Sequence, residues 1–248
     1  MSSSSKAALR AQKAAEMRAA QERQERRRRL LTIGGAAVAM LLLVGGIIAF
    51  SVWQQNQSEK DLEAAAGQPS DYGVAIGPED APHTVVIYED FLCPYCGELE
   101  AATREDLASL AADGKVRVEY RPFDLLSASF GDYPIRATNA FAVVLEKSGP
   151  EVAKRLHDLL YEHQPPESDP DSVTDDDLVE LAVEAGATET DVRDGIESLA
   201  QEAWVEQATA EAKKAGVTGT PTVLLDGQVF DDGRNVDDLA ANLIAQVE

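Results

Sequence analysis

The only two cysteines of this 248-residue chain, Cys93 and Cys96, flank the dipeptide Pro94-Tyr95. A disulfide that braces a fold gains most when it closes a long loop, and a gap of two residues forgoes most of that gain. The same spacing closes a small disulfide that can open and form again. The pair is therefore better suited to redox chemistry than to bracing.

Charge divides the chain into very different parts. Residues 1–29 hold nine Lys or Arg and three acidic side chains, which gives +6, whereas residues 54–248 hold 13 basic and 41 acidic side chains, which gives −28. Between them, residues 30–53 have no charged side chain. At about 1.5 Å per helical residue, this segment spans a hydrocarbon core of about 30 Å. We therefore expect one transmembrane helix over residues 30–53, embedded in the lipid bilayer.

The basic flank predicts the orientation of this helix, because positively charged flanks stay in the cytoplasm. Residues 1–29 are then a cytoplasmic tail and residues 54–71 a polar linker. Residues 72–248 form an extracytoplasmic domain on a single-pass protein of the plasma membrane. The alternative is a cleaved signal peptide, but the apolar core of such a peptide is only about 7–15 residues long. Outside the cytoplasm disulfides form and persist, which suits redox work on exported chains.

The charge of −28 argues against several partners. Nucleic acid is excluded, because phosphates need basic contacts, and so is docking of the folded domain on anionic lipid. A closed zinc site needs four ligands, and His83, His157 and His163 show no ligand-like spacing with the two cysteines. We expect no metal, and we interpret these histidines as surface or structural residues.

The residues around the cysteines predict the elements that hold them. The apolar run at 84–88 is typical of a strand buried on both faces, and residues 116–120 alternate as a second strand. After Cys96, apolar residues recur on one helical face until Asp113-Gly114, where a helix should stop. Strand, helix and strand predict a right-handed βαβ unit with Cys93 at the start of the helix.

Helical spacing returns at about residue 125 and continues to about residue 215, which predicts a helical insertion. Two capping boxes divide it. Thr174 with Asp177, and Thr188 with Asp191, each place a hydroxyl at the N-cap and a carboxylate three residues on.

Beyond the insertion, residues 222–225 and 228–230 predict two strands joined by Asp226-Gly227, a strong hairpin turn. Residues 236–247 predict a closing helix. The fold class is therefore α/β, in the order β-α-β, helical insertion, β-β-α.

Four features occur together in residues 72–248. They are the run Gly-Pro-Glu-Asp-Ala-Pro at 77–82, the segment Asp-Phe-Leu-Cys-Pro-Tyr-Cys at 90–96, the helical insertion, and Gly219-Thr220-Pro221-Thr222 at the start of a late strand. This arrangement resembles the thioredoxin superfamily and, within it, the DsbA-like thiol-disulfide oxidoreductases. The resemblance implies a thioredoxin fold with a helical insertion, preceded here by the transmembrane helix.

The resemblance also implies the roles of individual residues. Cys93 is the attacking cysteine and Cys96 resolves, while Thr220 and a cis-proline, Pro221, line the substrate groove. Helix physics agrees, because a thiolate at a helix N-terminus meets free N–H groups that lower its pKa. Pro94 fits the first helical turn, and Tyr95 is a surface ring for substrate contact. For Pro221 the alternative is an ordinary trans proline that starts a strand.

The sequence departs from the family pattern in one way that matters. Relatives usually have a buried acidic residue six positions before the first cysteine, where this chain has Ile87. Glu89 points to the same side of the strand and is our candidate for the proton relay to Cys96. The alternative is a solvated carboxylate at a strand end. Nearby Glu89, Asp90 and Glu98 would disfavour a thiolate at Cys93.

By this resemblance we expect an extracytoplasmic oxidase that introduces disulfides into exported proteins. Its substrates would be the thiols of those proteins, and its only redox group the Cys93–Cys96 disulfide, with no other cofactor. A membrane redox partner would reoxidise it. The alternatives are a reductase or isomerase, and a membrane-tethered binding module whose cysteines are inert.

Overall fold

The computed structural model describes residues 42–54 and 70–248, together with Met17, Arg28, Met40, Gln57, Lys60 and Leu62. The chain divides into two units, Met1–Asn56 and Gln57–Glu248, which we describe separately.

In the first unit, residues 42–54 are helical, and their large apolar side chains, among them Leu42, Ile47 and Phe50, are exposed. Within the part of the chain that the structure describes, no helix combines the length and the apolarity needed to cross a membrane. The predicted transmembrane segment covers residues 30–53, of which 30–39 and 41 lie outside the described residues.

A five-stranded mixed sheet forms the centre of the second unit, in the order β1-β3-β2-β4-β5. The strands are β1 (Val74–Ile76), β2 (His83–Glu89), β3 (Val116–Pro122), β4 (Thr222–Leu225) and β5 (Gln228–Val229). β2 and β3 are parallel and the other pairs are antiparallel. The predicted β-α-β unit is therefore confirmed, and its central strand β2 precedes the two cysteines.

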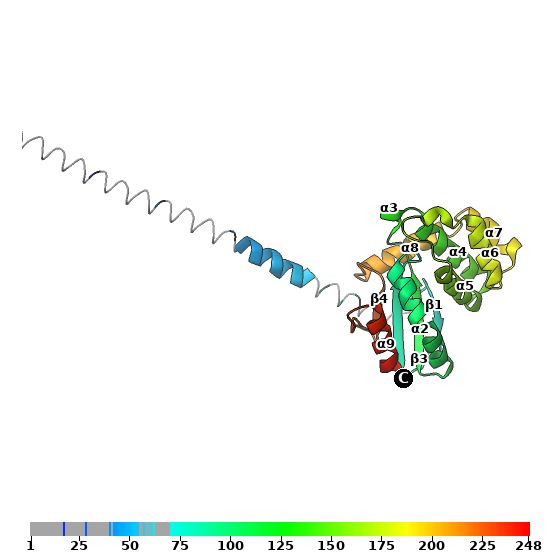
Figure 1. The fold of residues 1–248 in the computed structure, drawn as a ribbon, viewed down its shortest axis with the longest axis horizontal. Coiled ribbons are helices and arrows are strands. Elements are labelled where there is room, and N and C mark those ends of the chain that lie inside the picture. The colour runs from blue at the N-terminus through cyan, green and yellow to red at the C-terminus, as the bar shows by residue number, and fades with distance from the viewer. Residues whose placement is uncertain are drawn as a thin grey trace, which may run out of the picture. The chain divides into compact units, whose positions relative to one another are not determined.

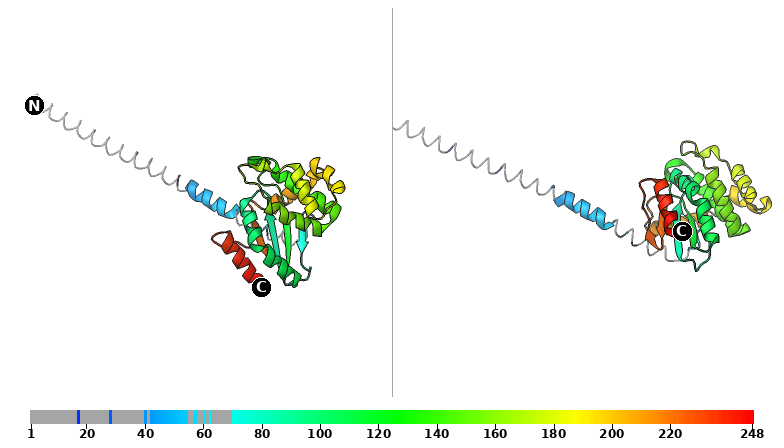
Figure 2. Two further views of the ribbon diagram at one scale, coloured as in Figure 1. Left: turned by 45° about the vertical axis from the view of Figure 1, so that its right-hand side comes forward. Right: turned by 60° about the horizontal axis from the view of Figure 1, so that its bottom comes forward.

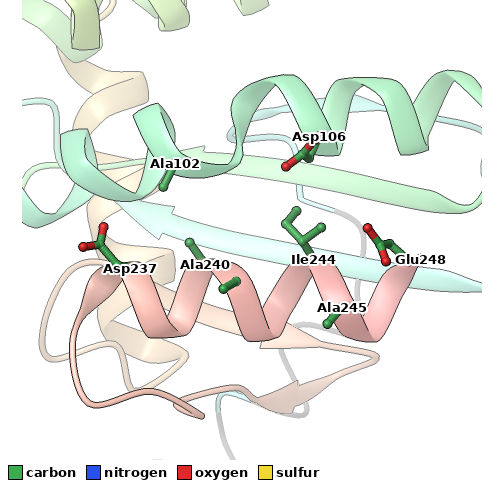
Figure 3. Close-up of a pocket in the computed structure, with 8 residues that line it drawn as sticks. Ala102, Asp106, Asp237, Ala240, Ile244, Ala245 and Glu248 are labelled. Atoms are coloured by element: carbon green, nitrogen blue, oxygen red, sulfur yellow. The ribbon is translucent and has the colours of Figure 1, made fainter.

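Helices cover both faces of this sheet. On one face Ile87 packs in the main core with α2 (Pro94–Ala112) and α9 (Val236–Val247), which lie side by side in Figure 3. On the other face Tyr88 packs with α8 (Glu202–Lys214). Because successive side chains of a strand point to opposite faces, β2 needs apolar residues at consecutive positions. This explains the unbroken apolar run that precedes the cysteines.

The predicted helical insertion between β3 and β4 is confirmed. It consists of α3 (Ser127–Phe130), α4 (Tyr133–Ser148), α5 (Pro150–Glu162), the 3-10 turn η1 (Pro170–Ser172), α6 (Asp175–Glu184), α7 (Glu189–Glu197) and α8. Figures 1 and 2 show α4 to α7 gathered as one group of helices beside the sheet. Helix α5 of this group contacts α2, the helix that begins at the cysteines.

The C-terminal hairpin and closing helix also follow the sequence pattern. Asp226 and Gly227 have φ values of 51° and 80°, and positive φ is what a two-residue hairpin turn requires. β5 ends at Val229, one residue earlier than predicted, and α9 has the predicted bounds.

The edge strand β1 was not predicted from the sequence. β1 has three residues, too few for a recognisable alternation, and it pairs with β3. Gly73 precedes it where the backbones almost touch, since an added Cβ would lie 2.3 Å from the carbonyl oxygen of Tyr120. Leu62 is buried in the same cluster as Tyr88, so apolar packing of this unit begins within the predicted linker at 54–71.

The two predicted capping boxes differ. At α6 the Thr174 hydroxyl accepts from the Asp177 amide and the Asp177 carboxylate accepts from the Thr174 amide, which confirms the box. At α7 the prediction was wrong: Thr188 is the N-cap residue, but its side chain makes no capping bond. The Asp191 amide instead donates to the backbone carbonyl of Thr188, so it has no need of the hydroxyl.

This difference predicts unequal costs for the same substitution. Thr174→Ala should lower the free energy of unfolding by about 1 kcal/mol, because an amide at the start of α6 loses its acceptor. Thr188→Ala should cost much less, since no capping bond is lost. Urea denaturation followed by circular dichroism measures both variants. Equal losses would mean that the side chain of Thr188 does cap α7.

Candidate active site

Cys93 is the N-cap residue of α2, and the turn that leads to it is held by Asp90. The amide of Cys93 donates to the carbonyl of Asp90 at 3.0 Å. The Asp90 carboxylate accepts from the amides of Leu92, Leu125 and Leu126 at 2.8, 2.8 and 3.0 Å. Burial raises the pKa of Asp90 to about 6. One buried carboxylate thus ties the turn before the cysteine to the loop after β3, a role that the sequence did not indicate.

Cys93 and Cys96 are both free thiols and both buried, with 5% and 2% of their surfaces exposed. A hydrogen bond from the Cys96 thiol lowers the pKa of Cys93 to about 6. Burial opposes this shift, but a side-chain hydrogen bond from Thr220 and the amides of Cys96 and Tyr95 support it. For Cys96 burial raises the pKa well above the usual value, and its hydrogen bond to Cys93 adds to the effect. One sulfur is therefore acidic and its neighbour is not.

Thr220 lies beside the cysteines because it precedes β4, which pairs antiparallel with β2 and places Thr222 opposite Tyr88. The Cys93 thiol donates to the Thr220 carbonyl at 3.3 Å, and the Thr220–Pro221 peptide bond is cis. Pro94 forms the first turn of α2 and is exposed, as is Tyr95, with 59% of its surface accessible. The two buried sulfurs therefore lie next to an exposed aromatic ring.

Glu89 lies at the end of β2, and the alternative of a solvated carboxylate is wrong. Only 2% of its surface is exposed, and its Oε1 lies 2.6 Å from Nε2 of His157, which is completely buried. The charge of Glu89 is one of the groups that raise the pKa of Cys96. Ile87 is buried in the apolar core. Glu89, two positions further along the strand, is thus a buried carboxylate whose charge acts on Cys96.

His157 forms a buried ionic cluster with its neighbours. Its Nδ1 lies 3.1 Å from Asp158 and 3.7 Å from Glu100, whose carboxylate is 3.4 Å from the Lys154 ammonium. Burial disfavours a charged His157, but the carboxylates of Glu89 and Glu100 outweigh it and raise its pKa to about 9. Burial also raises the pKa of Glu100 to about 7. Lys154 additionally contacts Asp158. Glu100 and Asp158 therefore lie close to both the ammonium and the imidazole, and Glu89 lies close to the imidazole alone.

His157 was interpreted as a surface or structural residue, and of these two alternatives the surface one is wrong. It is fully buried, and it pairs directly with the candidate proton relay. Its position on α5 offered a signal, because Ala153, Leu156 and Leu160 are buried on the same face of that helix. A histidine within such an apolar stripe must have partners from another element, but the stripe alone does not identify them.

A separate hollow of about 300 Å³ lies between α2 and α9 (Figure 3). Four of its eight lining residues are alanines, the others are Ile244 and three acidic residues, and none is a predicted site residue. This hollow is therefore separate from the two cysteines.

Comparison with known proteins identifies this arrangement. The thioredoxin family model matches residues 70–244. Among solved structures, the reduced disulfide bond oxidoreductase DsbG from Mycobacterium tuberculosis is 30% identical, with a TM-score of 0.62, over 75% of this chain and 91% of that one. Reduced DsbA from the same organism is 29% identical, with a TM-score of 0.59, over 71% of this chain and 90% of that one.

Curated sequences point the same way. Disulfide bond formation protein D from Bacillus subtilis is 25% identical over 189 residues, which are 74% of this chain and 82% of that protein. Other curated relatives, 29–30% identical, are much longer, and the chain spans only 22–24% of their length. The residues that the family model matches include the cysteine pair, Thr220 and the helical insertion. The chain belongs to the thioredoxin family, in the group that includes the DsbA- and DsbG-type thiol-disulfide oxidoreductases.

Proposed function

We propose that this chain is a thiol-disulfide oxidase that donates the Cys93–Cys96 disulfide to thiols of exported proteins. The observation that supports this most directly is the contrast between the two sulfurs. The pKa of Cys93 is lowered to about 6 and that of Cys96 is raised. A stabilised Cys93 thiolate favours the reduced form of the pair, and a pair whose reduced form is stabilised is a strong oxidant.

In the proposed reaction a substrate thiolate attacks Cys93 Sγ, and the Cys93–Cys96 bond breaks. Cys96 leaves with the electron pair and takes up a proton, because its raised pKa favours the thiol. A second substrate thiolate then attacks the substrate sulfur of the mixed disulfide, and Cys93 leaves as a thiolate. The substrate has lost two electrons and gained a disulfide, and the dithiol must pass those electrons to a membrane redox partner.

The exposed Tyr95 and the Thr220–Pro221 segment flank Cys93, and we propose that they form the groove for an extended substrate segment. A reductase or isomerase would use the same groove. The name of the Bacillus subtilis relative, a disulfide bond formation protein, favours the oxidase. The 30% identity to DsbG, described only as a disulfide bond oxidoreductase, does not favour either direction, so the potential of the cysteine pair must be measured to test the reductase or isomerase.

Equilibration with glutathione buffers tests the direction of the reaction. We expect the Cys93–Cys96 pair to have a potential nearer to about −120 mV, as in strongly oxidising relatives, than to about −270 mV, as in thioredoxin. The fraction of reduced protein at each glutathione ratio, read after acid quench and alkylation, provides the value. A potential near that of thioredoxin would favour a reductase.

Trapping of mixed disulfides distinguishes an enzyme from a binding module with inert cysteines. Cys96→Ala should accumulate mixed disulfides between Cys93 and exported proteins, because the resolving thiol is absent. The double variant with Cys93→Ala is the matched control and should accumulate none. A Cys96→Ala protein without adducts would support the module with inert cysteines.

We also propose that Glu89 exchanges the proton of Cys96. The hydrogen-bonded series runs from Glu89 to His157 at 2.6 Å and from His157 to Asp158 at 3.1 Å. Asp158 has 24% of its side chain exposed, whereas Glu89 and His157 have 3% and none. The series therefore leads from the neighbourhood of the buried thiol toward solvent. His157, whose pKa of about 9 keeps it protonated at neutral pH, is the positioning partner of the carboxylate.

Glu89→Gln should slow the attack of Cys96 on a mixed disulfide by about a hundredfold, the usual contribution of a positioned base. Rapid-quench measurement of peptide release from Cys93 provides the rate across a pH series. The exposed Glu105→Gln, further along α2, is the matched control and should leave the rate unchanged. Equal rates in both variants would contradict the relay.

Finally, we propose that residues 30–53 anchor the domain in the plasma membrane, with residues 1–29 in the cytoplasm. The basic tail, the uncharged segment and the exposed apolar side chains between Leu42 and Trp53 support the anchor.

An anchored protein should remain in the membrane pellet after an alkaline carbonate wash, and protease added outside spheroplasts should digest its domain. Arg26–Arg29 changed to Gln is a useful comparison, because loss of the basic flank should weaken this orientation. Release of a shortened chain into the soluble fraction would favour a cleaved signal peptide.

A further inference from the structure

Gln164 follows α5 directly after its C-cap residue, in a loop of the insertion, and its side chain reaches the turn at the start of α2. Its Nε2 donates to the carbonyl oxygens of Phe91 and Cys93, both at 2.9 Å. A primary amide has two N–H groups, and here each has one carbonyl acceptor. Both donors of Gln164 are therefore used on the backbone that flanks the reactive cysteine.

The Cys93 carbonyl oxygen accepts hydrogen bonds from three donors. Besides Gln164, the amides of Cys96 and Gly97 donate to it at 3.1 and 3.2 Å, as the first hydrogen bonds of α2. The orientation of this peptide group decides where the Cys93 sulfur lies relative to the amides of Tyr95 and Cys96. Those amides are among the groups that lower the pKa of Cys93.

Gly97 is a second observation that supports this contact, because only glycine fits beside the side chain of Gln164. A Cβ at this position would lie 2.6 Å from Oε1 of Gln164. Real Cβ atoms do not come so close to an oxygen, so any larger residue would push the amide aside. The glycine after the second cysteine leaves the space in which the side chain of Gln164 lies.

From this geometry we propose that Gln164 is a positioning residue for Cys93, and that Gly97 makes room for it. The amide holds the peptide of Cys93 in the orientation in which nearby N–H groups face the sulfur. Its own N–H dipoles also add positive potential at the start of α2, in the same sense as the helix dipole. The helical insertion thereby tunes the acidity of the thiol. This inference rests on the proposed function only in taking Cys93 as the reactive sulfur.

The test is the pH dependence of alkylation of the reduced protein, with the ultraviolet absorbance of the thiolate as a second readout. For the native chain we expect the rate to rise through a midpoint near the pKa of about 6. Gln164→Ala should raise that midpoint and lower the rate at about pH 5 by about two- to tenfold, the range that the loss of one hydrogen bond allows. Gln164→Glu should raise it further, because it loses the donor and adds a negative charge beside the sulfur.

Gly97→Ala should shift the midpoint in the same direction without altering Gln164 itself. If the two residues act through one contact, the double variant should be no worse than Gln164→Ala alone, which is the behaviour of coupled neighbours. Gln228→Ala, an exposed glutamine in β5, is the matched control and should leave the midpoint unchanged. Thermal unfolding of each variant separates a shift in acidity from a loss of fold.

The outcomes distinguish this inference from the proposed function. A native midpoint like that of free cysteine would contradict the proposed function itself. An acidic native midpoint that Gln164→Ala, Gln164→Glu and Gly97→Ala all leave in place would overturn the role of Gln164 alone. Additive shifts in the double variant would mean that Gly97 acts through something other than this amide.

Discussion

The hydrogen bond between the two cysteine sulfurs is the interaction on which the site depends. It is the largest single cause of the acidity of Cys93, and the same contact raises the pKa of Cys96. The two effects share one proton: a thiol that donates to a neighbouring sulfur is harder to ionise, while the sulfur that accepts is easier to ionise. Burial strengthens the contrast because solvent does not compete for the bond. The rest of the fold keeps both sulfurs buried and within reach of each other.

The helical insertion contributes more to the site than a cover. His157, Asp158 and Lys154 of α5 complete the ionic cluster around Glu89 and Glu100, and Gln164 comes from the loop that follows. Taking several charges out of water is costly, and removal of one partner would leave its neighbours uncompensated. The cluster therefore ties α5 to α2, because Lys154 and His157 of α5 both lie close to the carboxylate of Glu100 in α2. Sheet and insertion form one unit at the cysteines.

Much of this could be read from the sequence because its signals are local. The cysteine spacing, the doubly apolar strand, the helical spacing of the insertion and the Asp226-Gly227 turn each depend on neighbours within a few residues. The prediction of a capping box at α7 was wrong because the Asp191 amide donates to the backbone carbonyl of Thr188 and not to its hydroxyl. The two acceptors are nearly equal and belong to the same residue. Strand β1 is too short for its alternation to be visible.

The remaining site residues could not be predicted, because their partners are far away in the chain. Glu89 and His157 are 68 residues apart, and Cys93 and Gln164 are 71 apart. No pattern within one helix indicates which strand end a buried histidine meets. Asp90 looked like an unfavourable charge beside the thiol, yet its carboxylate faces three backbone amides. Whether a nearby carboxylate destabilises the thiolate depends on the direction in which its side chain points.

The bond between Cys93 and Thr220 joins residues 127 positions apart. During synthesis the N-terminal segments emerge first, and Cys93 precedes the insertion, β4 and Thr220 along the chain. Until the last third of the protein has been made and the sheet has closed, the sulfur has neither its threonine nor its buried surroundings. We therefore expect a nascent chain to present two ordinary, weakly acidic thiols. The lowered pKa of Cys93 is therefore a property of the finished fold and not of the local sequence alone.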